Sequence, residues 1–190
     1  TEILSLEDQY ENLEVHFIHG KWFHASEPVS TALDLSAARC QCEFQFQTHT
    51  DMFPMRKDFL RHWLRHCSPE QPVVGYEISP RGHVDGVLRG LWRGMVGHTC
   101  TMLHMPTIDN AKIIWKLLYG HQHYGLDHTT DTEVPFNLQL RDAGITPHFL
   151  GHDINFKRQQ DEWIDHVRSY PSSKMYDNNY HEQAKSWMAE

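Results

Sequence analysis

One stretch of the chain decides the predicted fold and function: residues 120–156, GHQHYGLDHTTDTEVPFNLQLRDAGITPHFLGHDINF. It holds five of the 16 histidines of the chain and five carboxylates, and Arg141 is its only arginine or lysine. Imidazoles and carboxylates with almost no fixed cation nearby are typical ligands of a divalent metal. We therefore predict a site for Zn, Fe or Mn. The expected metal ligands are His121, His123, His148, His152 and Asp131.

Three further residues of this stretch are expected to carry chemistry: His128, Glu133 and Asp153. A metal-bound water titrates near neutral pH and becomes a usable base or nucleophile. Without a metal, a histidine oriented by a carboxylate can still transfer protons. Glu133 also has a purely structural explanation, because a negative charge is favourable at the start of a helix.

Two helices are expected in and beyond this stretch. Residues 133–144 form the first, which ends at Gly144 in the manner of a helix C-terminus. Thr146 and Pro147 provide the cap and first-turn proline of a second, long helix. Its apolar side chains recur with a spacing of seven, so His152 is expected to be partly buried. His148 lies four residues before His152, a spacing at which two histidines on one helix can bind one metal ion.

The remaining elements are assigned from apolar periodicity and from proline and glycine. Helices are expected over residues 30–39, 54–67 and 107–120, and strands over 13–19 and 73–78. Residues 40–47 alternate apolar and polar side chains, which favours a strand but leaves a helix open. The predicted fold is mainly α: one helical domain, residues 1–190, with a minor β-hairpin or short strands in its N-terminal half. An α+β fold is the alternative.

Glycines recur every fourth residue in the segment 82–94, at Gly82, Gly86, Gly90 and Gly94. Glycines cost about 1 kcal/mol each inside a helix, so a closely approaching partner is expected to offset them. Small residues four apart allow such an approach. This segment is therefore a predicted homodimer contact, and Arg89 and Arg93 within it are predicted to bind an acidic group of the substrate.

Composition limits the class of protein. A formal net charge of −8 argues against a general nucleic-acid-binding protein. No uncharged apolar run reaches the ~20 residues that span a bilayer, so no membrane association is expected. The cysteines lack the paired spacing of zinc fingers and are too few for a disulfide framework. A reducing, cytoplasmic location is expected. The cysteines are Cys40, Cys42, Cys67 and Cys100.

The predicted function is that of a metal-dependent enzyme acting on a small organic molecule. Two alternatives remain open at this stage: a metal-free His/Asp lyase, isomerase or cyclase, and a non-catalytic ligand-binding helical domain. The chain has no P-loop, no dinucleotide-binding glycine pattern and no GxSxG motif, which argues against nucleotide-cofactor enzymes and serine hydrolases.

Overall fold

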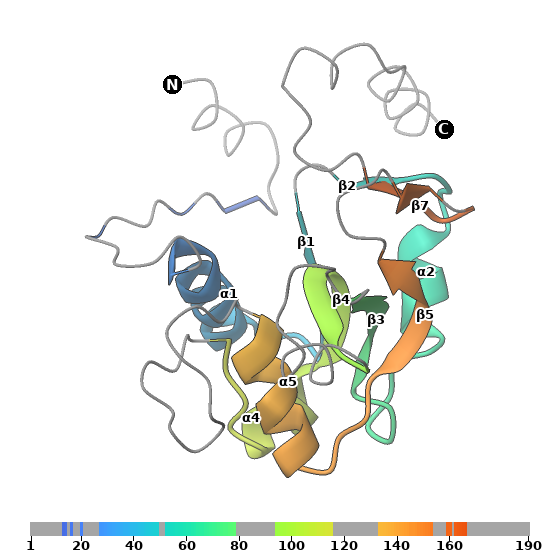
Figure 1. The fold of residues 1–190 in the computed structure, drawn as a ribbon. Helices are drawn as coiled ribbons and strands as arrows, with labels where there is room; N and C mark the ends of the chain where they lie inside the picture. The colour runs from blue at the N-terminus through green and yellow to red at the C-terminus, as the bar shows by residue number, and fades with distance from the viewer. Residues whose placement is uncertain are drawn as a thin grey trace, which may run out of the picture.

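The fold is seen in a computed structural model, which describes residues 13–14, 16, 20, 27–49, 52–78, 94–115, 133–153, 159–160 and 162–166. A four-stranded mixed sheet lies at the centre of the described part, with helices on both of its faces (Figure 1). Its strand order is β1-β4-β3-β5. The strands are β1 (Phe44–Thr48), β3 (Val73–Ile78), β4 (Val96–His104) and β5 (His148–Asp153).

Antiparallel pairing joins β4 to both β1 and β3, whereas β3 and β5 are parallel. The two central strands are rich in buried residues: Val73 and Val74 are fully covered, and β4 is buried at every position but one. Gly75 lies on β3 close to atoms of β4. A Cβ there would lie 2.5 Å from the Val96 side chain and 3.0 Å from the carbonyl oxygen of Cys100. Glycine is therefore the residue that fits this position.

A second, three-stranded sheet with the order β2-β7-β6 packs beside the first. Its members are β2 (Met52–Pro54), β6 (Gln159–Gln160) and β7 (Ile164–His166). Met52 and Ile164 of this sheet, together with Phe59 and Trp63 of α2 (Phe59–Leu64), cover one face of the main sheet. We call this face the α2 face.

Three helices cover the opposite face, which we call the helix face: α1 (Glu27–Arg39), α4 (Met105–Asn110) and α5 (Glu133–Asp142). Their contacts with the sheet are apolar, with Phe136 and Leu140 of α5 and Leu33 of α1 packed around Val73 and Leu103. Figure 1 shows these helices and α2 on opposite sides of the main sheet.

An insertion interrupts β4 near its start. Between the pairs Gly75–Thr101 and Glu77–Val96, two steps along β3 are matched by five along β4. Within the insertion, the Thr101 hydroxyl donates a hydrogen bond to the Gly97 carbonyl. The three extra residues reverse the alternation of side chains. Cys100 and Met102 pack on the α2 face, but Val96, also even-numbered, packs on the helix face.

Asn137 of α5 ties this helix to the interrupted strand. Its Oδ1 accepts a hydrogen bond from the Val96 N–H, and its Nδ2 donates one to the Val96 carbonyl, both at 2.8 Å. Nδ2 also donates to the carbonyl of Glu133, one turn earlier in the helix. Because Asn137 is 6% exposed, these bonds are made away from water, and they fix α5 against β4.

The predicted mainly helical fold is wrong, because the described part contains seven strands in two sheets. The largest error concerns residues 148–153, which form β5 and pair with β3 instead of starting a long helix. The helix predicted over residues 107–120 was also too long: α4 ends at Asn110, and Lys112 follows with a φ of 56°. The helix expected over 54–67 is confined to Phe59–Leu64.

Other local predictions are confirmed. The strand over 73–78 has the predicted bounds, and residues 40–47 contribute a strand, β1. Helix α5 begins at Glu133 as expected, and Gly144 follows it with a φ of 72°. A side chain is unfavourable at that angle, which explains why the helix ends beside a glycine. As separate observations, no helix in the described ranges is long and apolar enough to cross a bilayer, and none of the four cysteines is in a disulfide.

The first prediction concerns Asn137. Asn137→Ala removes the partners of the Val96 N–H and C=O in a buried setting, and we expect the free energy of unfolding to fall by about 3 kcal/mol. Urea denaturation followed by circular dichroism measures this value. The control is Asn110→Ala, at the exposed end of α4, which should change stability by less than about 0.5 kcal/mol. Equal effects of the two substitutions would contradict the role of Asn137.

Candidate polar cluster on the helix face

Most of the predicted site residues lie outside the residues that the structure describes. Backbone alone is described for His152 and Asp153, which belong to β5. Of the glycine-rich segment 82–94 only Gly94 is described, in a turn with a φ of 74°. The residues outside the described ranges are His121, His123, His128, Asp131, Arg89 and Arg93.

The two predicted site residues with described side chains, His148 and Glu133, lie on opposite faces of the main sheet. The His148 ring stacks on His66, just after α2, with ring centroids 5.1 Å apart. Glu133 starts α5 on the helix face. Because the sheet lies between them, His148 and Glu133 do not take part in one site.

Glu133 instead contacts a histidine that the sequence did not single out. His98 Nδ1 lies 2.8 Å from Glu133 Oε1, and both side chains are about 9% exposed. The ring nitrogen and the carboxylate are not aligned for a hydrogen bond, so the contact is electrostatic, and it is an ion pair only while His98 is protonated. The second carboxylate oxygen, Oε2, is buried without a hydrogen-bond partner among the described residues. A carboxylate held this way costs free energy unless something else satisfies it.

The fold explains how these two side chains meet. With regular alternation along β4, His98 would share the α2 face with Cys100 and Met102; the insertion turns it to the helix face, as it does Val96. Glu133 is brought there by the Asn137 hydrogen bonds that anchor α5 to Val96. Its place in the first helical turn also favours its negative charge.

Two aromatic side chains border the pair. The His49 ring lies 4.4 Å from the His98 ring. The backbone N–H of His49 donates to the Thr99 carbonyl, and this bond holds the end of β1 against β4. The Trp115 ring is 6.1 Å from that of His98 and stacks on Phe136 at 3.6 Å. The Trp115 backbone N–H donates to Asp34 of α1. Trp115 Nε1 is buried, and no acceptor in the described part of the chain takes its hydrogen.

A row of buried amides leads along β1 toward these residues. Gln45 Nε2 donates to the Ser36 hydroxyl at 2.7 Å, and Gln47 Nε2 donates to Gln45 Oε1 at 2.9 Å. Gln47 Oε1 is then buried with no donor from the described ranges. Gln45, Gln47 and His49 alternate with Phe44 and Phe46, which pack on the α2 face. We call Gln47, His49, His98, Trp115 and Glu133 the polar cluster.

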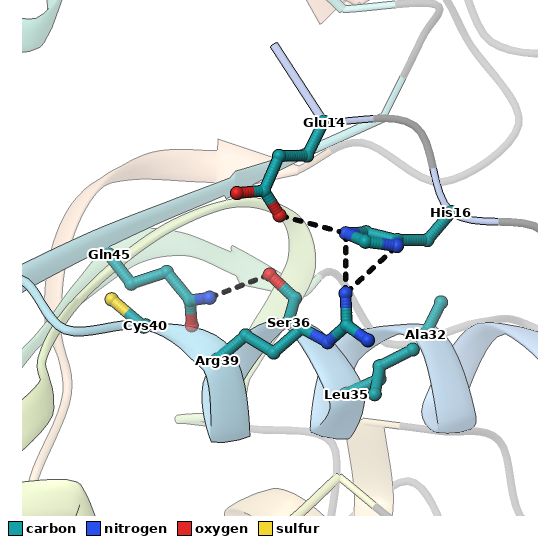
Figure 2. Close-up of a pocket in the computed structure, with 8 residues that line it drawn as sticks. All are labelled: Glu14, His16, Ala32, Leu35, Ser36, Arg39, Cys40 and Gln45. Atoms are coloured by element: carbon teal, nitrogen blue, oxygen red, sulfur yellow. Dashed lines mark hydrogen bonds and ion pairs between the residues drawn. The ribbon is translucent and has the colours of Figure 1, made fainter. Parts of the chain in front are cut away.

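A pocket of 460 Å³ lies at the other end of this row, between α1 and the segment around His16 (Figure 2). His16 contacts two charged side chains in it: Nε2 lies 3.0 Å from Glu14 Oε2, and Arg39 Nη1 lies 2.9 Å from Nδ1 and 2.7 Å from Nε2. Ser36 and Gln45 line the pocket as well. Hydrogen bonds through Ser36 and Gln45 thus connect the lining of the pocket to Gln47.

A second group of imidazoles lies on the α2 face. His62 stacks on Trp163 with ring centroids 3.8 Å apart and an angle of 6°, and the Arg56 guanidinium lies 4.2 Å over the Trp163 ring. His66 is 5.1 Å from both His62 and His148. Burial lowers the pKa of His62, and the nearby positive charges of His66 and Arg65 lower that pKa further. Glu162 and Asp58 oppose this shift.

Neither group provides a complete metal site by itself. Among the residues that the structure describes, no three His, Cys, Asp or Glu side chains are placed to hold a metal ion. The chemistry available in the polar cluster is therefore hydrogen bonding and proton transfer by a buried histidine beside a carboxylate.

Comparison of the whole chain with protein-family models and with curated proteins finds no match.

The lowered pKa of His62 predicts how stability depends on pH. With a pKa below the ordinary 6.5 in the folded state, the unfolded chain binds the proton first, so stability is present above about pH 6.5 and declines as the pH falls toward the folded value. His62→Gln should therefore lose less thermal stability between about pH 7.5 and pH 5 than the unmodified protein. Thermal melts at both pH values measure this. His16→Gln, at an exposed histidine, is the control. If His62→Gln lost as much thermal stability at low pH as the unmodified protein, the pH dependence could not be assigned to His62.

Proposed function

We propose that the protein is an acid–base enzyme acting on a small organic molecule, with His98 transferring the proton and Glu133 orienting and balancing the charge of the ring. The observation that supports this most is the 2.8 Å contact of His98 Nδ1 with Glu133 Oε1 in a buried setting. A carboxylate this close orients the ring and stabilises the imidazolium when it forms.

In this proposal, Nε2 is the nitrogen of His98 that exchanges a proton with the substrate, because Nδ1 faces Glu133. A proton taken from one atom of the substrate and returned to another gives an isomerisation. A proton removed together with departure of a neighbouring group gives an elimination or a ring closure. These reactions need no electron acceptor, and a positioned base of this kind contributes about 10²–10⁴-fold in rate.

Burial supports a chemical role for this pair over a purely structural one. A His–Glu pair that only joined α5 to β4 would duplicate the Asn137 bonds to Val96, which already do so. It would also leave Glu133 Oε2 without a partner in the described part of the chain, at a cost of about 1–3 kcal/mol. Groups kept in unfavourable settings of this sort are common where a protein binds or transforms a ligand.

A metal-dependent enzyme is the second candidate, for a specific topological reason. Trp115 and Glu133 both contact His98, so the His-rich residues 116–132 begin and end at the polar cluster. Two peptide units separate Asp131 from Glu133, which keeps their Cα atoms within about 7 Å of each other whatever path the chain takes. A metal held by Asp131 would then lie near the polar cluster, where it could activate water.

Deuterium exchange tests the proposal on a broad set of candidate substrates. The protein is incubated in D₂O with panels of small carbonyl compounds, hydroxy acids, amines and amino alcohols, and incorporation at carbon is read by mass spectrometry. We expect His98→Asn to lower the exchange rate by about 10²–10⁴-fold and Glu133→Gln by at least about tenfold.

Two controls make the result interpretable. His66→Asn and Glu43→Gln remove a histidine and a carboxylate away from the polar cluster and should leave the rate unchanged. Exchange that survives EDTA supports the metal-free enzyme, whereas exchange lost in EDTA and restored by Zn or Mn supports the second candidate. Full exchange in a folded His98→Asn protein would rule out the role given to His98.

A further inference from the structure

The polar cluster has hydrogen-bonding atoms that no described residue satisfies. Glu133 Oε2 and Gln47 Oε1 are acceptors without donors, and Trp115 Nε1 is a donor without an acceptor. Glu133 is 7% exposed, Gln47 5% and Trp115 1%, so bulk water does not reach these atoms freely. All three side chains lie on the helix face, on elements that meet at His98 and His49.

Unsatisfied atoms gathered in this way indicate a bound polar molecule. Each costs about 1–3 kcal/mol when buried alone, and native proteins have few of them. Trp63 Nε1 is a further buried nitrogen without a hydrogen-bond partner in the described part of the chain, and it lies on the α2 face. The three unsatisfied atoms of the polar cluster lie on the other face of the sheet, whereas accidental packing defects would be scattered over the molecule.

The amide row sets the direction in which Gln47 presents its oxygen. Gln47 Nε2 is committed to Gln45 Oε1, and Gln45 Nε2 is committed to Ser36. The carbonyl oxygen of the Gln47 amide is therefore turned away from this contact and is left for another donor. His49 is 4.4 Å from His98, which faces Glu133, so these two rings link β1, which carries Gln47, to the start of α5.

The charge of the Glu133 carboxylate indicates which kind of donor the ligand carries. Within the described ranges Glu133 is paired with His98 alone, so its second oxygen can accept from a cation, and charge-assisted hydrogen bonds are the stronger ones. An ammonium group brings three N–H donors. Aromatic faces also attract cations, and the Trp115–Phe136 stack adjoins the site. The formal net charge of −8 favours the approach of a cation over that of an anion.

We propose that the polar cluster binds a small organic amine bearing a second hydrogen-bond donor, with its ammonium group on Glu133 Oε2 and its second donor on Gln47 Oε1. This inference rests on the proposed function, since it names the substrate class of the same site. The amino alcohols are the simplest compounds of this class. The ammonium group and the hydroxyl are then held beside the His98 ring.

Three probes of the same size and different charge test the ligand class: ethanolamine, ethylene glycol and glycolate. Binding to the full chain is followed by protein-observed NMR titration, using the indole N–H signals as reporters. We expect ethanolamine to bind at least about tenfold more tightly than ethylene glycol, a difference of about 1.4 kcal/mol, and glycolate to bind weakest. Absence of saturable ethanolamine binding, or equal binding of ethylene glycol, would overturn the proposal.

Variants locate the two contacts. Glu133→Gln should weaken ethanolamine at least about tenfold, while Glu43→Gln, at an exposed carboxylate that also faces a histidine, should not. Gln47→Leu should weaken ethanolamine but leave ethylamine, which lacks the hydroxyl, unaffected. Unchanged ethanolamine binding in folded Glu133→Gln protein, or equal losses for both amines in Gln47→Leu, contradicts the assigned contacts.

The two proposals fail in different ways. Ethanolamine binding in the expected order, with no deuterium exchange on any compound, would remove the catalytic role and keep the amine site. Exchange that depends on His98, on compounds that ethanolamine does not inhibit, would keep the acid–base function and remove the amine site.

Discussion

The insertion in β4 is the constraint on which the rest of the helix face depends. Without the three extra residues between Val96 and Thr101, side-chain alternation would place Val96 with Cys100 and Met102 on the α2 face. The insertion turns it to the other side, and the irregular backbone leaves the Val96 amide and carbonyl to be satisfied by Asn137. The position of α5 follows from these two bonds, and the position of Glu133 follows from that of α5.

The same sheet thus gives its histidines two different environments. On the helix face, His98 is buried among aromatic rings and beside a carboxylate, where electrostatic interactions are strong because water is largely excluded. On the α2 face, His62 and His66 are half-buried beside arginines, and burial together with the positive charges of His66 and Arg65 lowers the pKa of His62. A histidine beside a carboxylate is suited to gain and release a proton, whereas His62, with its lowered pKa, packs against Trp163.

Parts of the fold followed from local signals, and these parts were predicted. Helix α5 has a negative residue in its first turn and a glycine beyond its end, and β3 is bounded by proline on one side and turn residues on the other. Strand β5 was predicted as a helix because Thr146 and Pro147 resemble a helix start and apolar side chains recur with a spacing of seven from Phe149. What makes it a strand is parallel pairing with β3, more than seventy residues away. No local pattern carries that information.

The site was harder to predict than the fold, for a related reason. Histidine density along the chain drew attention to residues 120–156, but the polar cluster is assembled from Gln47, His98 and Glu133, which are far apart in sequence. The alternation of Gln45 and Gln47 with Phe44 and Phe46 was a usable signal, because two amides on a covered face need partners. His98 gave no such signal. Its face depends on the number of residues inserted before Thr101, and a change of one would move it to the other side of the sheet. A histidine placed by an irregularity in a strand can therefore be assigned a role only after the pairing of that strand is known.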